Sequence, residues 1–302
     1  MRSHRVRILA ATALAPAALA VAMVLGGCSG ASGPGPGGSS SGGSGTTSPA
    51  PNSASATPSP SGSVSPSPTT TLSSSPAPPP PTSPVLDACA VTSRHRGQDL
   101  EVLPTNERLI ALTFDAGGSD AGVSSILGTL AAKDTPATFF LTGAFVRAFP
   151  RAALQIAAAH PVGNHTDTHP DLTTLPDASV VDEVRRGAGA IRASTGRDPA
   201  PWFRFPYGAR DARTIALVND ECYVPMRWTV DTLGWQGTSG GRSVDSVRQR
   251  VLGAARPGAI VLMHVGAHPS DGSTLDADAL SGVIDGLRAQ GYQFVDLPHA
   301  IG

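Results

Sequence analysis

Short apolar runs and longer amphipathic stretches alternate along the last two thirds of the chain. The apolar runs of strand length cover residues 109–115, 137–141, 161–164, 202–205, 223–230, 259–264 and 293–297. Apolar residues recur at helical spacing in 121–133, 145–159 (with a break expected at Pro150), 178–195, 212–218, 244–254 and 275–290. This alternation predicts an α/β fold with a parallel sheet covered by helices, either a barrel or an open sheet. In both architectures, functional side chains lie at the C-terminal ends of the strands.

The first 28 residues have the pattern of an export signal. Arg2, Arg5 and Arg7 precede an apolar run over 8–25, and small residues lead to Cys28. The sequence LGGC resembles the lipobox of bacterial lipoproteins, in which the cysteine is lipid-modified. We therefore expect a lipoprotein-type signal peptide at 1–28 and a domain anchored by lipid to the outer face of the cell membrane. An uncleaved transmembrane anchor and a secreted protein are the alternatives.

Residues 29–86 contain Ser, Pro, Gly, Thr and Ala, a few Asn, Val and Leu, and no charge. Such a composition buries too little apolar surface to offset chain entropy, so it predicts a disordered linker. The folded domain is expected at 87–302. It holds all 23 acidic residues and all but three of the 22 Lys and Arg, a net charge of −4, so a nucleic-acid partner is not expected.

The chain has three cysteines. If Cys28 carries lipid, Cys89 and Cys222 remain as a pair in an oxidising compartment, which favours a disulfide. Two separate buried thiols are the alternative.

Reactive side chains fall at or just after the ends of the predicted strands. They are Asp115, His165, His169, Arg204, Tyr207, Asp231, Trp235 and His264. Two histidines four residues apart in a loop can bind one metal ion. Asp115 can act as a base, Arg204 can hold it ionised, and His264 can donate a proton. Taken singly, each residue also has a structural interpretation, such as a helix cap, a surface ion pair or a core histidine.

The motifs TFDAG, HTDTH, RFPYG, DTLGW and LMH, with the closing LRAQGYQFVDL, resemble the polysaccharide deacetylases of the NodB-homology group, carbohydrate esterase family 4. The resemblance extends from about residue 108 to the end. It implies a distorted (β/α) barrel that removes acetyl groups from N-acetylated sugars, or less often O-acetylated ones, with a divalent metal. We expect Zn²⁺, with Co²⁺, Mn²⁺ and Ni²⁺ as alternatives.

The resemblance also implies roles for individual residues. Asp115 would be the general base, oriented by Arg204, and His264 the general acid. His165 and His169 would bind the metal, and the backbone N–H of Tyr207 would bind the oxyanion. The substrate pocket would include Trp235, Leu262, Trp228 and Asp231.

Two positions depart from the family pattern. Where relatives usually have a second acid that binds the metal, this chain has Ala116. Asp120, Asp115 or water molecules are the candidates for the third ligand. Where relatives usually have the acid that pairs with the catalytic histidine, this chain has Gly234. Asp231 is the acid left in that motif, and His268 and Asp271 are nearby in the sequence.

The leading functional hypothesis is therefore an extracellular, lipid-anchored, metal-dependent deacetylase of an N-acetylated glycan such as peptidoglycan or chitin oligomers. A glycan-binding module that has lost catalysis is the first alternative, motivated by Ala116 and Gly234. An esterase acting on O-acetylated xylan or a related polymer is the second.

Overall fold

The computed structural model describes residues 86–302. The expected signal peptide, Cys28 and nearly all of the expected linker lie outside these residues. None of the helices in the described part is both long and apolar enough to cross a membrane. The strands are β1 (Leu109–Ala116), β2 (Ala137–Leu141), β3 (Val162–Asn164), β4 (Trp202–Phe203), β5 (Val224–Pro225), β6 (Val230–Asp231), β7 (Ala259–His264) and β8 (Gln293–Phe294). The α-helices are α1 (Ala88–Arg94), α2 (Val123–Ala132), α3 (Gly143–Ala148), α4 (Pro150–Ala159), α5 (Asp177–Thr195), α6 (Ala212–Asp220), α7 (Val244–Ala254), α8 (Leu275–Ala289) and α9 (Leu297–Ile301).

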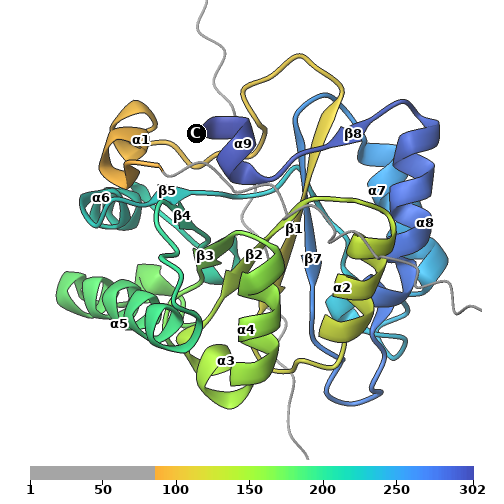
Figure 1. Ribbon diagram of the computed structural model, residues 1–302. Helices are drawn as coiled ribbons and strands as arrows, with labels where there is room; N and C mark the ends of the chain where they lie inside the picture. Colours follow the sequence, from red (N-terminus) through yellow and green to blue (C-terminus); the bar gives the residue numbers. More distant parts are fainter. Residues whose placement is uncertain (1–85) are drawn as a thin grey trace, which may run out of the picture. The chain divides into compact units, whose positions relative to one another are not determined.

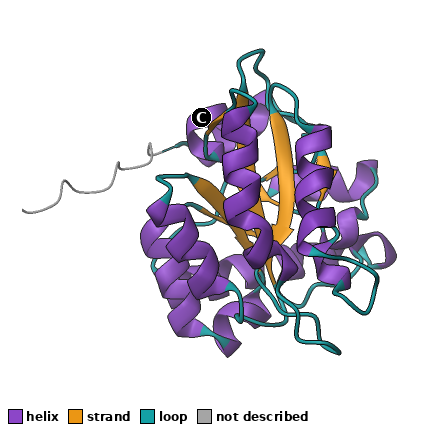
Figure 2. Cartoon of the chain, turned by 90° about the vertical axis from the view of Figure 1, so that its right-hand side faces the viewer, coloured by secondary structure: helices purple, strands orange, loops and turns teal. Residues whose placement is uncertain are grey.

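The strands form one parallel sheet in the order β5-β4-β3-β2-β1-β7-β6, and β8 pairs with the start of β1. Helices pack around this sheet (Figures 1 and 2). The segment before β1 lies between the chain that follows β5 and strand β7: Leu100 forms a parallel bridge with Met226, and Val102 an antiparallel bridge with Ala259. The curled sheet with this irregular closure is the expected distorted (β/α) barrel.

Strand β1 shows how the sheet sorts its side chains. Ile110, Leu112 and Phe114 belong to the main apolar core, which also contains buried residues of α2, α4, α7 and α8. Because successive residues of a strand point to opposite faces, Thr113 and Asp115 point to the other face, the barrel interior. The polar end of this otherwise apolar strand therefore opens into the barrel.

A second apolar cluster lies on the interior side of the sheet. It includes Ala111 of β1, Phe140 of β2, Ile260 of β7 and Leu297 and Ile301 of α9. The backbone N–H of Leu297 donates to Thr138 Oγ1 of β2. Helix α9 thus closes the interior near the N-terminal ends of the strands. Polar side chains therefore line the interior at the C-terminal ends of the strands.

The region 223–230, predicted as one strand, is instead two short strands on opposite edges of the sheet. Strand β5 pairs with β4, whereas β6 pairs with β7. The chain between them passes Leu100, to whose carbonyl Arg227 donates its backbone N–H. Residues 223–230 therefore span the gap in the barrel. The prediction of a single strand was wrong, because apolar content alone does not reveal that a segment changes its partner strand.

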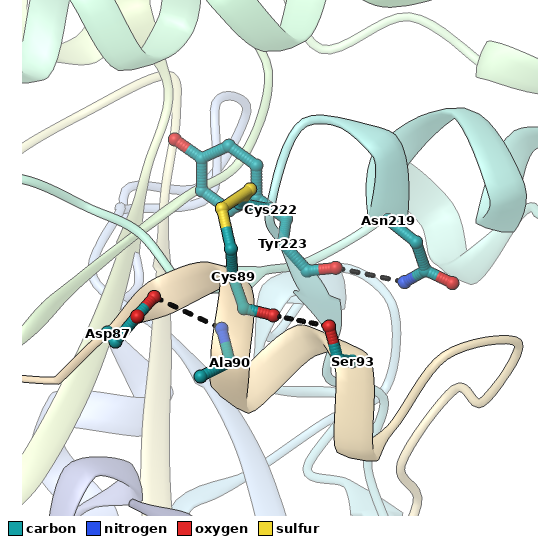
Figure 3. The surroundings of a disulfide bond; sticks show 7 residues. All are labelled: Asp87, Cys89, Ala90, Ser93, Asn219, Cys222 and Tyr223. Atoms are coloured by element: carbon teal, nitrogen blue, oxygen red, sulfur yellow. Dashed lines mark hydrogen bonds between the residues drawn. A yellow bond between two sulfur atoms is a disulfide. The ribbon is translucent and has the colours of Figure 1, made fainter.

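A disulfide joins Cys89 of α1 to Cys222, just after α6 (Figure 3). This is the pair that the cysteine count predicts. Arg96 forms an ion pair with Asp220, and the backbone N–H of Gly97 donates to Asn219 Oδ1. The first helix, which the apolar pattern did not predict, is therefore held against the end of α6 by covalent and polar contacts.

Candidate active site

Two predicted catalytic residues lie side by side at the C-terminal ends of neighbouring strands. Asp115 of β1 and His264 of β7 are partners in the parallel register. Residues in register on adjacent strands point to the same face, so both side chains reach the open end of the barrel. Asp115 is 8% exposed, whereas the His264 side chain is 26% exposed. A carboxylate and an imidazole therefore meet at one rim.

Arg204, which follows β4, crosses the interior to reach Asp115. It is fully buried, and its Nη1 donates to Asp115 Oδ1 at 2.8 Å. Its Nε and Nη2 donate to the carbonyls of Met226 and Arg227, and its guanidinium lies 4.1 Å from the ring centroid of Phe140. Burial, the largest single influence, would raise the pKa of Asp115, but the charge and hydrogen bond of Arg204, together with His165 and His264, outweigh it and hold that pKa below its ordinary value. Asp115 is thus ionised at neutral pH.

His165, directly after β3, lies against the same carboxylate. Its Nδ1 is 2.8 Å from the carbonyl oxygen of Arg204, and its Nε2 is 3.4 Å from Asp115 Oδ2. Burial lowers the pKa of His165 despite the nearby charge of Asp115. The neutral ring donates from Nδ1 to the carbonyl, because a carbonyl only accepts. The lone pair of Nε2 therefore faces Asp115.

His169 lies beside His165, with ring centroids 4.7 Å apart, and the ring of Tyr207 packs edge-on against it at 4.6 Å. Burial and the neighbouring His165 lower the pKa of His169 to about 4. Both histidines are therefore neutral at pH 7, the form that binds metals.

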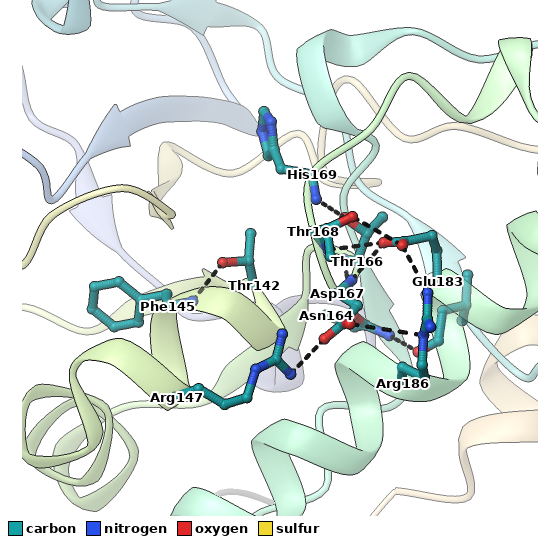
Figure 4. Close-up of polar contacts among 11 residues, drawn as sticks. Thr142, Phe145, Arg147, Asn164, Thr166, Asp167, Thr168, His169, Glu183 and Arg186 are labelled. Atoms are coloured by element: carbon teal, nitrogen blue, oxygen red, sulfur yellow. Dashed lines mark hydrogen bonds and ion pairs between the residues drawn. The ribbon is translucent and has the colours of Figure 1, made fainter.

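The loop between the two histidines is held in an unusual backbone conformation. Thr166 and His169 have φ values of 68° and 66°, in the left-handed region that non-glycine residues rarely adopt. Glu183 of α5, a buried carboxylate, accepts hydrogen bonds from the backbone N–H groups of Asp167 and Thr168 at 3.0 and 2.8 Å (Figure 4). These contacts offset the backbone strain and fix the histidines on one side of the loop.

The other side of Asp167 meets two cations. Arg147 of α3 donates to Asp167 Oδ1 at 2.6 Å, and Arg186 of α5 lies 3.7 Å from Oδ2 (Figure 4). Asn164 adds a further restraint, because its Oδ1 accepts from the Thr166 backbone and its Nδ2 donates to the Val184 carbonyl. The loop thus bridges α3 and α5.

The partner of His264 comes from helix α8. Asp276 is 3% exposed, and its Oδ2 accepts from the backbone N–H of His264 at 2.8 Å and lies 3.3 Å from His264 Nδ1. Burial of the ring would lower the pKa of His264, but its hydrogen bond to Asp276 and the charges of Asp276 and Asp115 raise it above the ordinary value. His264 therefore keeps its proton to a higher pH than a free histidine, as suits a proton donor.

The remaining predicted pocket residues lie along the same rim. Leu262 is buried in β7, in register with Asp231 of β6. The carboxylate of Asp231 accepts from the backbone of Leu233 and from Trp235 Nε1, at 2.8 and 3.3 Å. It therefore orients the half-exposed Trp235 rather than pairing directly with His264. Trp228 packs against Gly208 and lies near Arg204.

Tyr207 adopts φ 59° and exposes 72% of its surface. Strained backbone of this kind concentrates at functional sites. One side of the phenol ring packs against His169 and the rest is exposed to solvent.

Of the two side chains predicted as a third metal ligand, Asp115 and Asp120, only Asp115 contacts one of the two histidines. No group of three or more His, Cys, Asp or Glu side chains within 86–302 converges on one point where an ion could be held. Among the described residues, no hydrogen bond or ion pair joins the side chain of Asp120 to either histidine. Ala116 is fully buried in the main core. His268 and Asp271 pair with each other.

Neither Glu183 nor Asp276 is predicted from the sequence, although a signal for both is present. Each is a buried acid on the apolar face of its helix: Glu183 shares that face with Val180 and Gly187, and Asp276 with Leu280 and Val283. A charge at such a position must be paired, since burying it alone is costly. Acids that interrupt an apolar helix face are thus the pattern to search for.

Comparison with known proteins agrees with this geometry. The family model described as polysaccharide deacetylase matches residues 103–224. A chitooligosaccharide deacetylase of Rhizobium leguminosarum bv. trifolii is 34% identical over 205 residues, covering 64% of this chain and 92% of the relative. A peptidoglycan-N-acetylglucosamine deacetylase of Bacillus cereus is 31% identical over 196 residues, covering 65% of this chain and 69% of the relative.

Among solved structures, a carbohydrate esterase family 4 pseudoenzyme from Bacillus anthracis superposes with a TM-score of 0.62 at 29% identity, over 68% of this chain and 69% of that protein. A mutant of that pseudoenzyme is described as having restored enzymatic activity. The match to nearly the full length of a deacetylase, together with the shared fold and the residues gathered at the rim, shows that this chain belongs to the polysaccharide deacetylase family.

Proposed function

We propose that this protein is a hydrolase that removes N-acetyl groups from a glycan such as peptidoglycan or chitin oligomers. The observation that carries the proposal is the pairing of Asp115 and His264, an ionised carboxylate and a proton-bearing imidazole in register on adjacent strands. The two relatives named above, whose names give chitooligosaccharide and peptidoglycan N-acetylglucosamine as substrates, support the choice of glycan.

The donor atoms at the site fit a divalent cation. The Nε2 lone pair of His165 and Asp115 Oδ2 lie 3.4 Å apart in a buried place, where two acceptors facing each other repel. A cation held beside them would remove that repulsion. His165 and His169 would hold the ion next to Asp115. We expect Zn²⁺, with Co²⁺, Mn²⁺ or Ni²⁺ as alternatives. Such an ion supplies polarisation of the acetyl carbonyl and of the attacking water.

Two side chains of the protein, Asp115 and His264, carry out the proton transfers of the proposed reaction. Asp115, kept ionised by Arg204, accepts the proton of the water that attacks the acetyl carbon. The backbone N–H of Tyr207 donates to the oxyanion that develops on the carbonyl oxygen. His264 gives its proton to the sugar nitrogen as the carbon–nitrogen bond breaks. Acetate and a free amine are the products.

Aromatic side chains at the rim suit a sugar substrate. Trp235 is half exposed and is oriented by Asp231, and Trp228 lies near Arg204. Together with Leu262 they offer an apolar wall to the acetyl methyl group, and flat faces on which a sugar ring can pack.

The N-terminal sequence supports a location outside the cytoplasm. A lipid on Cys28 and an uncharged linker would hold the domain near the cell wall, within reach of a polymer. An uncleaved anchor or a secreted form would also place it outside. Lipid labelling of the wild type and of Cys28→Ala separates the lipoprotein from the other two cases, because only a lipoprotein is labelled and loses its label in the variant.

A second candidate function, a glycan-binding module without catalysis, is favoured by one observation. The position at which relatives usually have a metal-binding acid is Ala116, buried in the apolar core, and a family member of similar structure is described as a pseudoenzyme.

Acetate release distinguishes the two functions. Purified wild type and His165→Ala are incubated with chitin oligomers, peptidoglycan and O-acetylated xylan. A deacetylase releases acetate from the first two, and His165→Ala loses this activity. Sugar binding without acetate release from any substrate favours the binding module. Release from xylan alone identifies an esterase.

A further inference from the structure

We propose that Asp276 of helix α8 is the positioning residue of His264, and that Gly234 is a glycine in order to leave room for it. This inference rests on the proposed function, because it assigns Asp276 a task within the same reaction. Asp276 would hold the ring through Nδ1, so that Nε2 is the nitrogen that meets the substrate.

The contacts of Asp276 are directed at His264. Its Oδ2 accepts from the His264 backbone N–H at 2.8 Å and lies 3.3 Å from the ring Nδ1. One oxygen therefore restrains both the backbone and the ring of the same residue. Since a carboxylate only accepts hydrogen bonds, this contact selects the tautomer with the proton on Nδ1 whenever the ring is neutral.

The burial of Asp276 has no evident structural reason. Its side chain is 3% exposed, and among the described residues its Oδ1 has no hydrogen-bond partner. A buried, incompletely paired carboxylate costs stability. An acid in the first turn of a helix is favourable, yet the exposed Asp278 in the same turn provides this benefit without burial. The position of Asp276 is therefore explained by His264 rather than by the helix.

Gly234 lies next to the carboxylate of Asp276. A Cβ at residue 234 would be 2.6 Å from Asp276 Cγ and closer still to Oδ1. The carboxyl group of Asp276 thus occupies the space into which a side chain at 234 would point. Gly234 is the position at which the family pattern usually has an acid. Helix α8 here supplies a carboxylate to the same place, from a residue 42 positions later in the chain.

An exchange between the two positions tests this arrangement. We expect Asp276→Ala to lower kcat by about 10- to 100-fold, the usual effect of losing such a supporting carboxylate, with KM changed by less than about threefold. Gly234→Asp alone also loses activity, because the new side chain meets Asp276. The double variant Gly234→Asp/Asp276→Ala returns a carboxylate to the site and recovers at least about tenfold over Asp276→Ala. The control Asp278→Ala keeps wild-type activity.

The tautomer of His264 gives a readout that does not need activity. Long-range ¹H–¹⁵N correlation spectra of the histidine-labelled protein at pH 9 report which ring nitrogen carries the proton. We expect Nδ1–H in the wild type and in the double variant, and a mixture in Asp276→Ala. Asp276→Leu, of similar volume but without an acceptor, gives the same mixture and is used if the alanine variant does not fold.

An unchanged Nδ1–H tautomer in both Asp276 variants overturns the inference, as does a wild-type kcat in Asp276→Ala. Should the wild type release no acetate while the tautomer shifts as expected, the proposed function fails and the positioning of His264 by Asp276 stands.

Discussion

The rim has two sides, one around the proposed base Asp115 and one around the proposed acid His264. Each side holds its reactive group in a fixed geometry, but the supporting residues come from different sources. On the base side, Asp115 is held by Arg204 and flanked by His165, all at positions that the family motifs predict. On the acid side, His264 also lies at its predicted position, but its carboxylate partner comes from α8 instead of from residue 234. The proposed acid thus has its carboxylate partner on a different element from the one that the family pattern predicts.

The largest effect is expected on the base side, from Asp115→Asn. The amide has nearly the shape of the carboxylate but cannot take a proton at neutral pH. We expect kcat/KM for acetate release to fall by about 10³- to 10⁴-fold, more than for Asp276→Ala. Thermal unfolding of the variant serves as the control for folding. An activity within about tenfold of the wild type would remove Asp115 from the role of base.

Glu183→Ala tests the support of the histidine loop on the base side. Without this carboxylate, the N–H groups of Asp167 and Thr168 lose their acceptor, so the loop is free to leave its strained conformation. We expect the affinity for Zn²⁺, measured by titration calorimetry, to fall by about 10- to 100-fold. Asp182→Ala removes an exposed acid of the same helix and should leave the affinity unchanged. Equal losses in both variants would point to a general effect of charge.

Gly234→Ala is the smallest change that disturbs the acid side. A methyl group there pushes the carboxylate of Asp276 away from His264, and we expect kcat to fall by about tenfold. Gly189→Ala in α5 is the matched control, because a Cβ at that position meets no atom within 4 Å. That variant should keep full activity and gain up to about 1 kcal/mol in the free energy of unfolding. Full activity in Gly234→Ala would mean that the carboxylate can move without consequence.

His160 provides a comparison outside both sides of the rim. Burial beside Phe139 lowers its pKa to about 4 in the folded protein, against 6.5 for an exposed histidine. The unfolded chain therefore binds a proton more readily, and stability is lost as the pH falls from 6.5 toward 4. We expect His160→Leu to reduce this loss by on the order of 2 kcal/mol, measured by urea unfolding at pH 7 and pH 4.5. Equal losses in variant and wild type would contradict the assignment. Acetate release at pH 7 should not change.

The sequence predicts those parts of the fold that depend on local periodicity. The rim positions of Asp115, His165, Arg204 and His264 follow from apolar runs that end in polar residues. The division of 223–230 into β5 and β6 does not follow from periodicity, because it depends on which strands pair with each half of the segment.

The supporting residues are also hidden from local patterns. Glu183 and Asp276 act through contacts with segments 15 and 12 residues away, respectively, in the chain. Only their position on apolar helix faces marks them. The positive φ values at Thr166 and Tyr207 are likewise unmarked in the sequence, because neither residue is of a type enriched in that region.

The central claim is that the two sides act together around one divalent cation to release acetate. The most direct test is a titration of metal-free wild-type protein with Zn²⁺, in which acetate release from a chitin oligomer and bound metal are measured on the same samples. The account predicts no release in chelator and a rate that rises to its maximum at one ion per chain. A full rate in the presence of chelator, with no metal bound, would contradict it.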